Sequence, residues 1–111
     1  MKKQYITKDS GIRATFESGF QRDTNEGKPR YDLIPVSMLT RLAELYARGA
    51  IKYGDSNWQL AKTPEEINRF KESAWRHFIQ WQSGEDDEDH ASAVVFNIFA
   101  YEYLTNRSII V

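Results

Sequence analysis

An unbroken run of five acidic residues, Glu85 to Asp89, separates two segments that are expected to form the core of this chain. A segment rich in Trp and His (75–81) precedes the run, and an almost wholly apolar segment (91–103) follows it. Placing so much negative charge between two core-forming segments costs free energy unless the acids stay in water or bind a cation. The acidic run is therefore the first place to look for a functional site.

Helical periodicity predicts an all-α fold with three main helices. The first helix is expected to begin at Pro35 and to end at Gly54. Its apolar face recurs at three- and four-residue steps and comprises Leu39, Leu42, Tyr46, Ala50 and Tyr53.

The second helix has a strong start signal, with Thr63 as N-cap, Pro64 at the first position and Glu66 closing a capping box. We expect it to end at Gly84. Its buried stripe is predicted to comprise Ile67, Phe70, Ala74, Phe78 and Trp81.

The third helix follows the acidic run and is apolar around nearly its whole circumference, which is typical of a central helix. Asn97 is its one strongly polar residue between positions 93 and 101, and it shares a stripe with His90. A buried Asn needs hydrogen-bond partners, and either a neighbouring helix or a ligand would supply them.

The first 30 residues show neither helical nor strand periodicity and are expected to form a flexible arm with little structure of its own. Residues 31–111 are then the helical domain. No β-pattern of any length is visible.

Composition narrows the function classes. The 111 residues are 41% hydrophobic and 14% aromatic, enough for one core, and the net charge of −1 does not favour nucleic-acid binding. There is no cysteine, no signal-peptide pattern and no apolar run long enough to span a membrane. We expect a soluble, cytoplasmic protein that makes its core larger by pairing into a homodimer or homotetramer, with Trp75 and Trp81 buried.

Several candidate site residues have two interpretations at this point. The acids, among them Glu85, Glu88 and Asp89, are either Mg²⁺ ligands or a solvated cluster. Glu44 is a ligand or an ion-pair partner of nearby arginines, and Glu72 has the same ambiguity with Arg76.

Further candidates are equally open. His77 is a ligand or a satisfied core histidine. Asn57 and Trp58 hold a base or ribose, or pack a loop. Lys28 and Arg30 form a basic clamp over an anion, or belong to a solvated linker.

Four elements, in this order, resemble phage-encoded MazG-like dATP/dGTP diphosphohydrolases. They are G-K-P-R-Y-D-L-I-P (27–35), R-G-A-I-K-Y-G-D-S-N-W (48–58), R-H (76–77) and G-E-D-D-E-D-H (84–90) followed by Asn97. The resemblance implies an all-α, oligomeric, Mg²⁺-dependent enzyme, with Mn²⁺ as an alternative metal. Its products would be a nucleoside monophosphate and pyrophosphate, formed in the host cytoplasm if the chain is phage-encoded.

On this resemblance, the site residues fall into three groups. The metal ligands would be Glu44, Glu72, Glu85, Glu88 and Asp89, and the catalytic residues Glu72, His77, Asp89 and His90. The nucleotide would be bound by Lys28, Arg30, Lys52, Tyr53, Asn57, Trp58, Arg76 and Asn97. The MazG-type pair of Glu at i,i+3 on one helix has no counterpart before the acidic run, because Glu44 stands alone and Trp75 follows Glu72 at i+3.

Two other interpretations compete with this one. A noncatalytic helical interaction module would leave the acids solvated and use its aromatic face to grip a partner. An HD-type phosphohydrolase ranks third, because its adjacent His-Asp pair occurs here only in reverse, as Asp89-His90.

Overall fold

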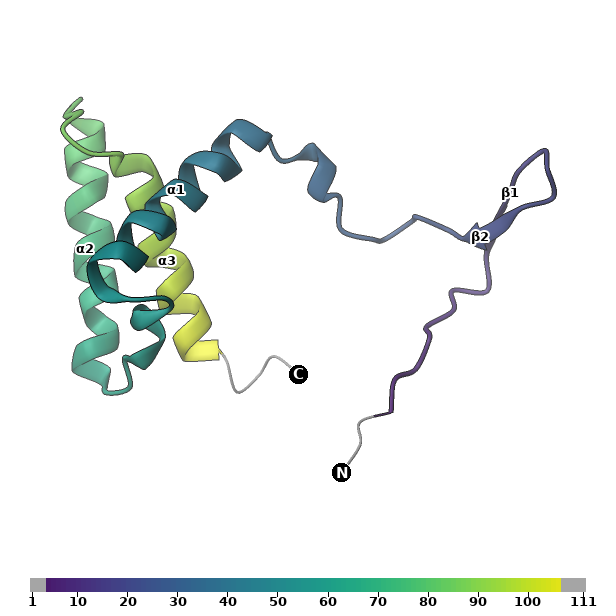
Figure 1. The fold of residues 1–111 in the computed structure, drawn as a ribbon, viewed down its shortest axis with the longest axis horizontal. Coiled ribbons are helices and arrows are strands. Elements are labelled where there is room, and N and C mark those ends of the chain that lie inside the picture. The colour runs from purple at the N-terminus through teal and green to yellow at the C-terminus, as the bar shows by residue number, and fades with distance from the viewer. Residues whose placement is uncertain (1–3, 107–111) are drawn as a thin grey trace. The chain divides into compact units, whose positions relative to one another are not determined.

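The computed structural model describes residues 4–106, and the chain divides into two compact units, residues 1–33 and 34–111. The first unit contains two short strands, β1 (Arg13–Thr15) and β2 (Gln21–Asp23), and a 3₁₀ turn at Tyr31–Leu33. The second contains three helices, α1 (Val36–Tyr53), α2 (Pro64–Gln82) and α3 (His90–Asn106) (Figure 1). A further 3₁₀ turn, Asn57–Leu60, links α1 to α2. The predicted all-α architecture of three main helices is confirmed.

The two strands of the first unit form an antiparallel hairpin that the sequence did not predict. Arg13 pairs with Asp23 in the register, and the rings of Phe16 and Phe20 lie 5.4 Å apart at the hairpin loop. The guanidinium of Arg13 also donates two hydrogen bonds of 2.7 Å to Asp9. Strands of three residues are too short to show a two-residue period, which is why the pattern was invisible.

The predicted helix ends are confirmed by their capping groups. Thr63 accepts from the backbone N–H of Glu66 at 3.1 Å, and the carboxylate of Glu66 accepts from the backbone N–H of Thr63 at 3.2 Å. At the end of α1, Gly54 has a φ of 95°, a conformation that glycine adopts without a steric penalty. These interactions span at most four residues, so they could be recognised in the sequence.

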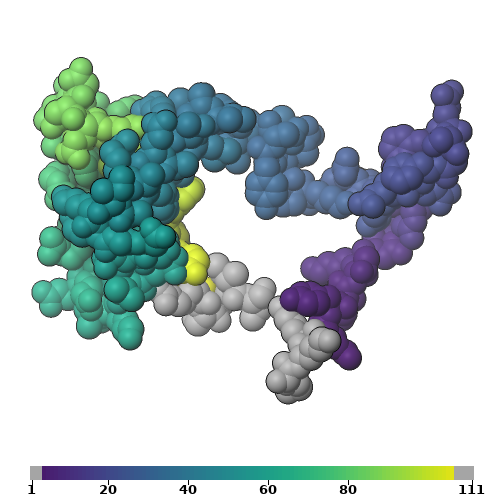
Figure 2. Space-filling model, viewed as in Figure 1, coloured from purple at the N-terminus to yellow at the C-terminus, as the bar shows by residue number. Residues whose placement is uncertain are grey.

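The core of the second unit lies mainly between α2 and α3. Five buried side chains of α3 recur at alternating three- and four-residue steps, namely His90, Ala93, Asn97, Ala100 and Leu104. The two alanines keep this seam narrow and allow the neighbouring backbone to approach closely. In the space-filling view, α1 and the turn that follows it lie in front of most of α3 (Figure 2).

A cluster of aromatic rings joins α1 to the other two helices. Its centre is Phe96, whose ring centroid lies 5.0 Å from that of Tyr46, 6.2 Å from Trp58 and 6.3 Å from Phe70. All three contacts are edge-to-face, the arrangement that aromatic quadrupoles favour. The 57–60 turn is held against the helices by these contacts.

The predicted buried stripe of α2 is wrong in its second half. Ile67, Phe70 and Ala74 are half-buried as expected, but Phe78 is 37% exposed and Trp81 54% exposed. The interior instead continues through His77 and Gln80. Apolar residues flank both sides of this helix, so only the packing against α3 decides which side faces inward.

The expected burial of Trp75 and Trp81 is likewise absent within one chain, where Trp75 is 67% exposed. No residue of α1 or α2 is fully buried. Among residues 4–106, no helix is long and apolar enough to cross a membrane.

Candidate functional site

An open groove in the second unit brings together many of the predicted site residues. It lies between the C-terminal half of α1, the loop after it, one side of α2 and the start of α3, and has a volume of about 1440 Å³. Pockets for small ligands measure roughly 300–1,000 Å³, so this groove is wide and open. The predicted residues that line it are Glu44, Lys52, Tyr53, Asn57, Trp58, His77, Glu88, Asp89 and Asn97.

Four predicted residues of the second unit, Glu72, Arg76, Glu85 and His90, do not line this groove. The carboxylate of Glu72 is reached by Nε of Arg69 at 3.9 Å and by Nδ2 of Asn68 at 3.4 Å. Arg76 instead contacts the hydroxyl of Ser73 at 3.4 Å, so the expected Glu72–Arg76 ion pair is not formed. Convergence of Glu72 with Glu44 and Asp89 stays a prediction, without support in one chain.

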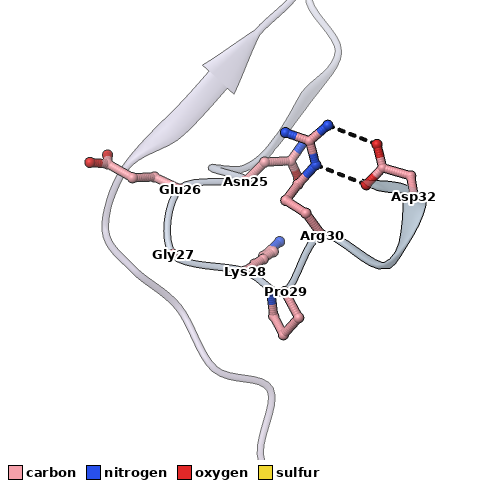
Figure 3. A pocket seen from close by; sticks show the side chains of 7 residues that line it. All are labelled: Asn25, Glu26, Gly27, Lys28, Pro29, Arg30 and Asp32. Atoms are coloured by element: carbon pink, nitrogen blue, oxygen red, sulfur yellow. Dashed lines mark hydrogen bonds and ion pairs between the residues drawn. The ribbon is translucent and has the colours of Figure 1, made fainter. Parts of the chain in front are cut away.

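The predicted basic clamp residues Lys28 and Arg30 line a separate open pocket, within the first unit (Figure 3). Nε and Nη2 of Arg30 donate to the two carboxylate oxygens of Asp32 at 2.8 and 2.7 Å. This hydrogen-bonded pair lowers the pKa of Asp32 and raises that of Arg30. The charge of Arg30 is thus already offset within its own loop, while the ammonium of Lys28 has no ion pair among the described residues.

Asp89 connects α1 to α3. Nε and Nη2 of Arg41 donate to its two oxygens at 3.0 and 2.6 Å, across 48 positions of the sequence. Asp89 also precedes α3 and accepts from the backbone N–H and the hydroxyl of Ser92 at 3.2 and 2.8 Å, as an N-cap does. Arg41, followed by these hydrogen bonds from Ser92, holds the pKa of Asp89 far below its usual range.

The pairing of Arg41 with Asp89 bears on Glu44, for which the sequence allowed either a metal-ligand role or an ion pair with nearby arginines. Arg41, one of its expected ion-pair partners, is engaged by Asp89, and Glu44 forms no ion pair with any described residue. Glu44 is therefore not an ion-pair partner of the nearby arginines, and its carboxylate is available to a ligand in the groove.

The two histidines of the chain lie in contact. His90 is only 2% exposed, and its Nε2 lies 2.7 Å from Oδ1 of Asp87. Its Nδ1 lies 2.9 Å from Nδ1 of His77, which is half-buried and lines the groove. Burial is the main cause that lowers the pKa of His77. Asp87 was not among the predicted residues, although its position three residues before a helical histidine was a usable signal.

The amide and aromatic side chains of the groove differ in how far hydrogen bonds and ring packing within the chain already engage them. Nδ2 of Asn97 donates to the backbone oxygen of Ala93 at 2.7 Å, which leaves its Oδ1 without a hydrogen bond among the described residues. The ring of Trp58 packs against the aromatic cluster and lies 5.3 Å from that of Tyr103. Trp58 therefore packs the loop, which is one of the two interpretations that the sequence allowed for it. Nζ of Lys52 lies 5.1 Å from the ring of Tyr53.

No three His, Asp or Glu side chains within residues 4–106 are grouped closely enough to hold a metal ion. Glu44 and Glu88 nevertheless line the same groove, and neither carboxylate forms an ion pair with a described residue. Mg²⁺ is commonly bound by one or two carboxylates together with substrate phosphates, rather than by a cage of protein ligands. The donor set fits such shared binding and does not fit a preformed metal centre.

Comparison with known proteins points to one family. Residues 18–109 match the family described as dATP/dGTP diphosphohydrolase, N-terminal. Comparisons with curated proteins and with solved structures gave no match. The matched range includes all three helices and every residue of the groove.

Proposed function

The chain belongs to the dATP/dGTP diphosphohydrolase N-terminal family, and we propose that it hydrolyses dATP or dGTP to the nucleoside monophosphate and pyrophosphate. The groove of the second unit is the proposed site. The observation that supports it most is that one groove carries carboxylates without ion pairs, among them Glu44 and Glu88, beside a set of cationic side chains. A triphosphate and its metal require these two kinds of group side by side.

Cationic and uncharged residues of the groove would bind different parts of the nucleotide. Lys52 and Arg48 on α1 would offset the charge of the phosphate oxygens, because charge-assisted hydrogen bonds to phosphate are strong. The amides of Asn57 and Asn97 offer donors and acceptors for a base or a sugar. Trp58 would hold the 57–60 turn in place through the aromatic cluster rather than stack on the base.

Mg²⁺, or Mn²⁺ in its place, is the proposed cofactor. Glu44 and Glu88 are the carboxylates that would share it with the phosphates. A bound divalent cation supplies charge neutralisation and a more acidic water molecule. Because the groove holds no preformed metal cluster, we expect weak binding of Mg²⁺ alone and much tighter binding in the presence of nucleotide. Titration calorimetry with Mg²⁺, with and without a non-hydrolysable dATP analogue, measures both.

The test of the reaction is pyrophosphate release with Mg²⁺ from the eight common NTPs and dNTPs, with the nucleotide product identified by chromatography. Glu44→Gln should remove activity, and Glu65→Gln, the same change on an exposed first turn, is the matched control. Glu72→Gln tests whether Glu72 belongs to the site. Retained activity confines the site to the groove, whereas lost activity brings Glu72 into it. A folded protein that releases no pyrophosphate from any nucleotide refutes the proposal and favours the interaction module.

We further propose that the protein is a homodimer or homotetramer. Trp75, Phe78 and Trp81 form a ladder of adjacent rings on the exposed side of α2, with centroids 6.1 and 5.9 Å apart. A contiguous exposed patch of this kind typically marks an interaction surface. Light scattering after size exclusion should give two or four chains, and Trp75→Ser should shift the distribution towards the monomer. A wild-type monomer at micromolar concentration contradicts the proposal.

A further inference from the structure

A line of three side chains, Asp87, His90 and His77, connects the acidic turn to α2. The carboxylate of Asp87 lies at one end, the buried ring of His90 in the middle and the ring of His77 at the other end, and both end residues line the groove. Both links are within hydrogen-bonding distance, at 2.7 and 2.9 Å. The two rings face each other through the same kind of nitrogen, Nδ1, so only one of these two nitrogens can carry a proton.

The positions of the protons along this line are fixed from the end at Asp87. The side chain of Asp87 is 65% exposed, so its carboxylate is ionised near neutral pH and can only accept. Nε2 of His90 must then be the donor. In the state in which both rings are neutral, each imidazole has a single N–H, so Nδ1 of His90 is an acceptor and Nδ1 of His77 donates to it.

The remaining nitrogen of His77 follows by the same rule. With its proton on Nδ1, a neutral His77 has a lone pair on Nε2. This atom has no hydrogen-bond partner among residues 4–106, and the side chain lines the groove. Burial favours the neutral ring, since it lowers the pKa of His77. The unprotonated nitrogen thus belongs to the one histidine that reaches the proposed site.

We propose that Asp87 is a positioning residue that acts through His90 to hold His77 in its Nδ1–H tautomer, so that Nε2 of His77 accepts a proton from the attacking water. This inference rests on the proposed hydrolysis. As the water oxygen bonds to the α-phosphorus, the bond to the bridging oxygen breaks and its electron pair leaves with pyrophosphate. One water proton moves to Nε2 of His77 and passes to solvent after the products leave.

The tautomers are directly measurable, because the chain has only two histidines. Long-range ¹H–¹⁵N correlation spectra of the full-length protein, recorded where both rings are neutral, distinguish Nδ1–H from Nε2–H. His77→Gln assigns the two sets of signals. We expect Nδ1–H at His77 and Nε2–H at His90. An Nε2–H tautomer at His77 in the wild type overturns the inference.

Variants of the acidic turn then test Asp87 itself. In Asp87→Asn the side-chain amide can donate to His90, which reverses the line and puts the proton of His77 on Nε2, as in the Asp→Asn change of a serine-protease triad. Asp86→Asn makes the same charge change one residue away and should leave both tautomers as in the wild type. Asp87→Glu should keep the wild-type tautomers. A His77 tautomer that does not respond to Asp87→Asn overturns the role of Asp87.

Kinetics provide the second readout. Asp87→Asn should lower kcat by roughly 10²-fold or more, the lower range of general acid–base catalysis, with little change in KM. An unchanged kcat overturns the inference. The two proposals fail separately. A wild type with the expected tautomers that releases no pyrophosphate refutes the hydrolase, whereas an active enzyme with Nε2–H at His77 refutes only the tautomer relay.

Discussion

Replacing Asp89 by alanine should destabilise the helical unit, because this residue both caps α3 and ties it to α1. The carboxylate accepts two hydrogen bonds from Ser92 and two from Arg41. Asp89→Ala removes all four at once. One of the four is the N-cap bond, so the backbone N–H of Ser92 in the first turn of α3 loses its side-chain acceptor.

The magnitude follows from the two roles. Loss of an N-cap costs about 1 kcal/mol, within a range of roughly 0.5–2 kcal/mol. In a domain of 60–100 residues, 1 kcal/mol shifts Tm by roughly 4–8 °C. The ion pair adds a smaller increment, since the side chain of Arg41 is 45% exposed and water screens it. We therefore expect Asp89→Ala to lower Tm by at least about 4 °C.

Thermal unfolding followed by circular dichroism measures this, and two variants separate the roles. Asp89→Ser keeps a capping oxygen and loses the ion pair, while Arg41→Met loses the ion pair and keeps the whole cap. Both should fall between the wild type and Asp89→Ala. A Tm for Asp89→Ala equal to that of the wild type would refute the reasoning. Activity lost in Asp89→Ala must be judged against this instability before it is taken as evidence for catalysis.

The same group predicts a pH dependence. The pKa of Asp89 is lowered in the folded state from its ordinary value of 3.8. Such a carboxylate stabilises the fold above its unfolded-state pKa, and this stabilisation is lost as pH falls through the folded-state pKa. The difference in Tm between the wild type and Asp89→Asn should thus be constant near neutral pH and shrink below about pH 4. A difference that grows on acidification would contradict the assigned sign.

Three further substitutions test the fold. Thr63→Ala removes the capping box of α2 and should cost about 1 kcal/mol in urea unfolding, whereas Thr63→Ser should cost much less. Ala100→Leu places a larger side chain at a fully buried position of the α2–α3 seam, where overpacking costs about 1–3 kcal/mol, so an unchanged unfolding midpoint would mean that the seam is looser than described. Oε1 of Gln80 is buried with no hydrogen-bond partner among the described residues, so Gln80→Met should keep or raise Tm, and a clear fall would show that this oxygen is paired in solution.

The sequence by itself determined the three helices and their ends. Thr63 and Glu66 act on each other across one turn, and Gly54 ends α1 through its own backbone conformation. Such signals are complete within a few residues, so no knowledge of the rest of the fold is needed. The four short elements that resemble dATP/dGTP diphosphohydrolases also predicted the family to which the chain belongs. They also contain predicted residues, such as Lys52 and Asn57, that meet in one groove.

Only the tertiary structure decided what those residues do for one another. Arg41 lies 48 positions before Asp89, and His77 lies 13 before His90, so neither contact follows from helical spacing. The face of α2 that turns inward was also undetermined, because apolar side chains flank it on both sides and packing against α3 selects the side with His77. Local backbone chemistry fixes where a helix begins and ends, whereas burial and long-range pairing depend on which surfaces meet.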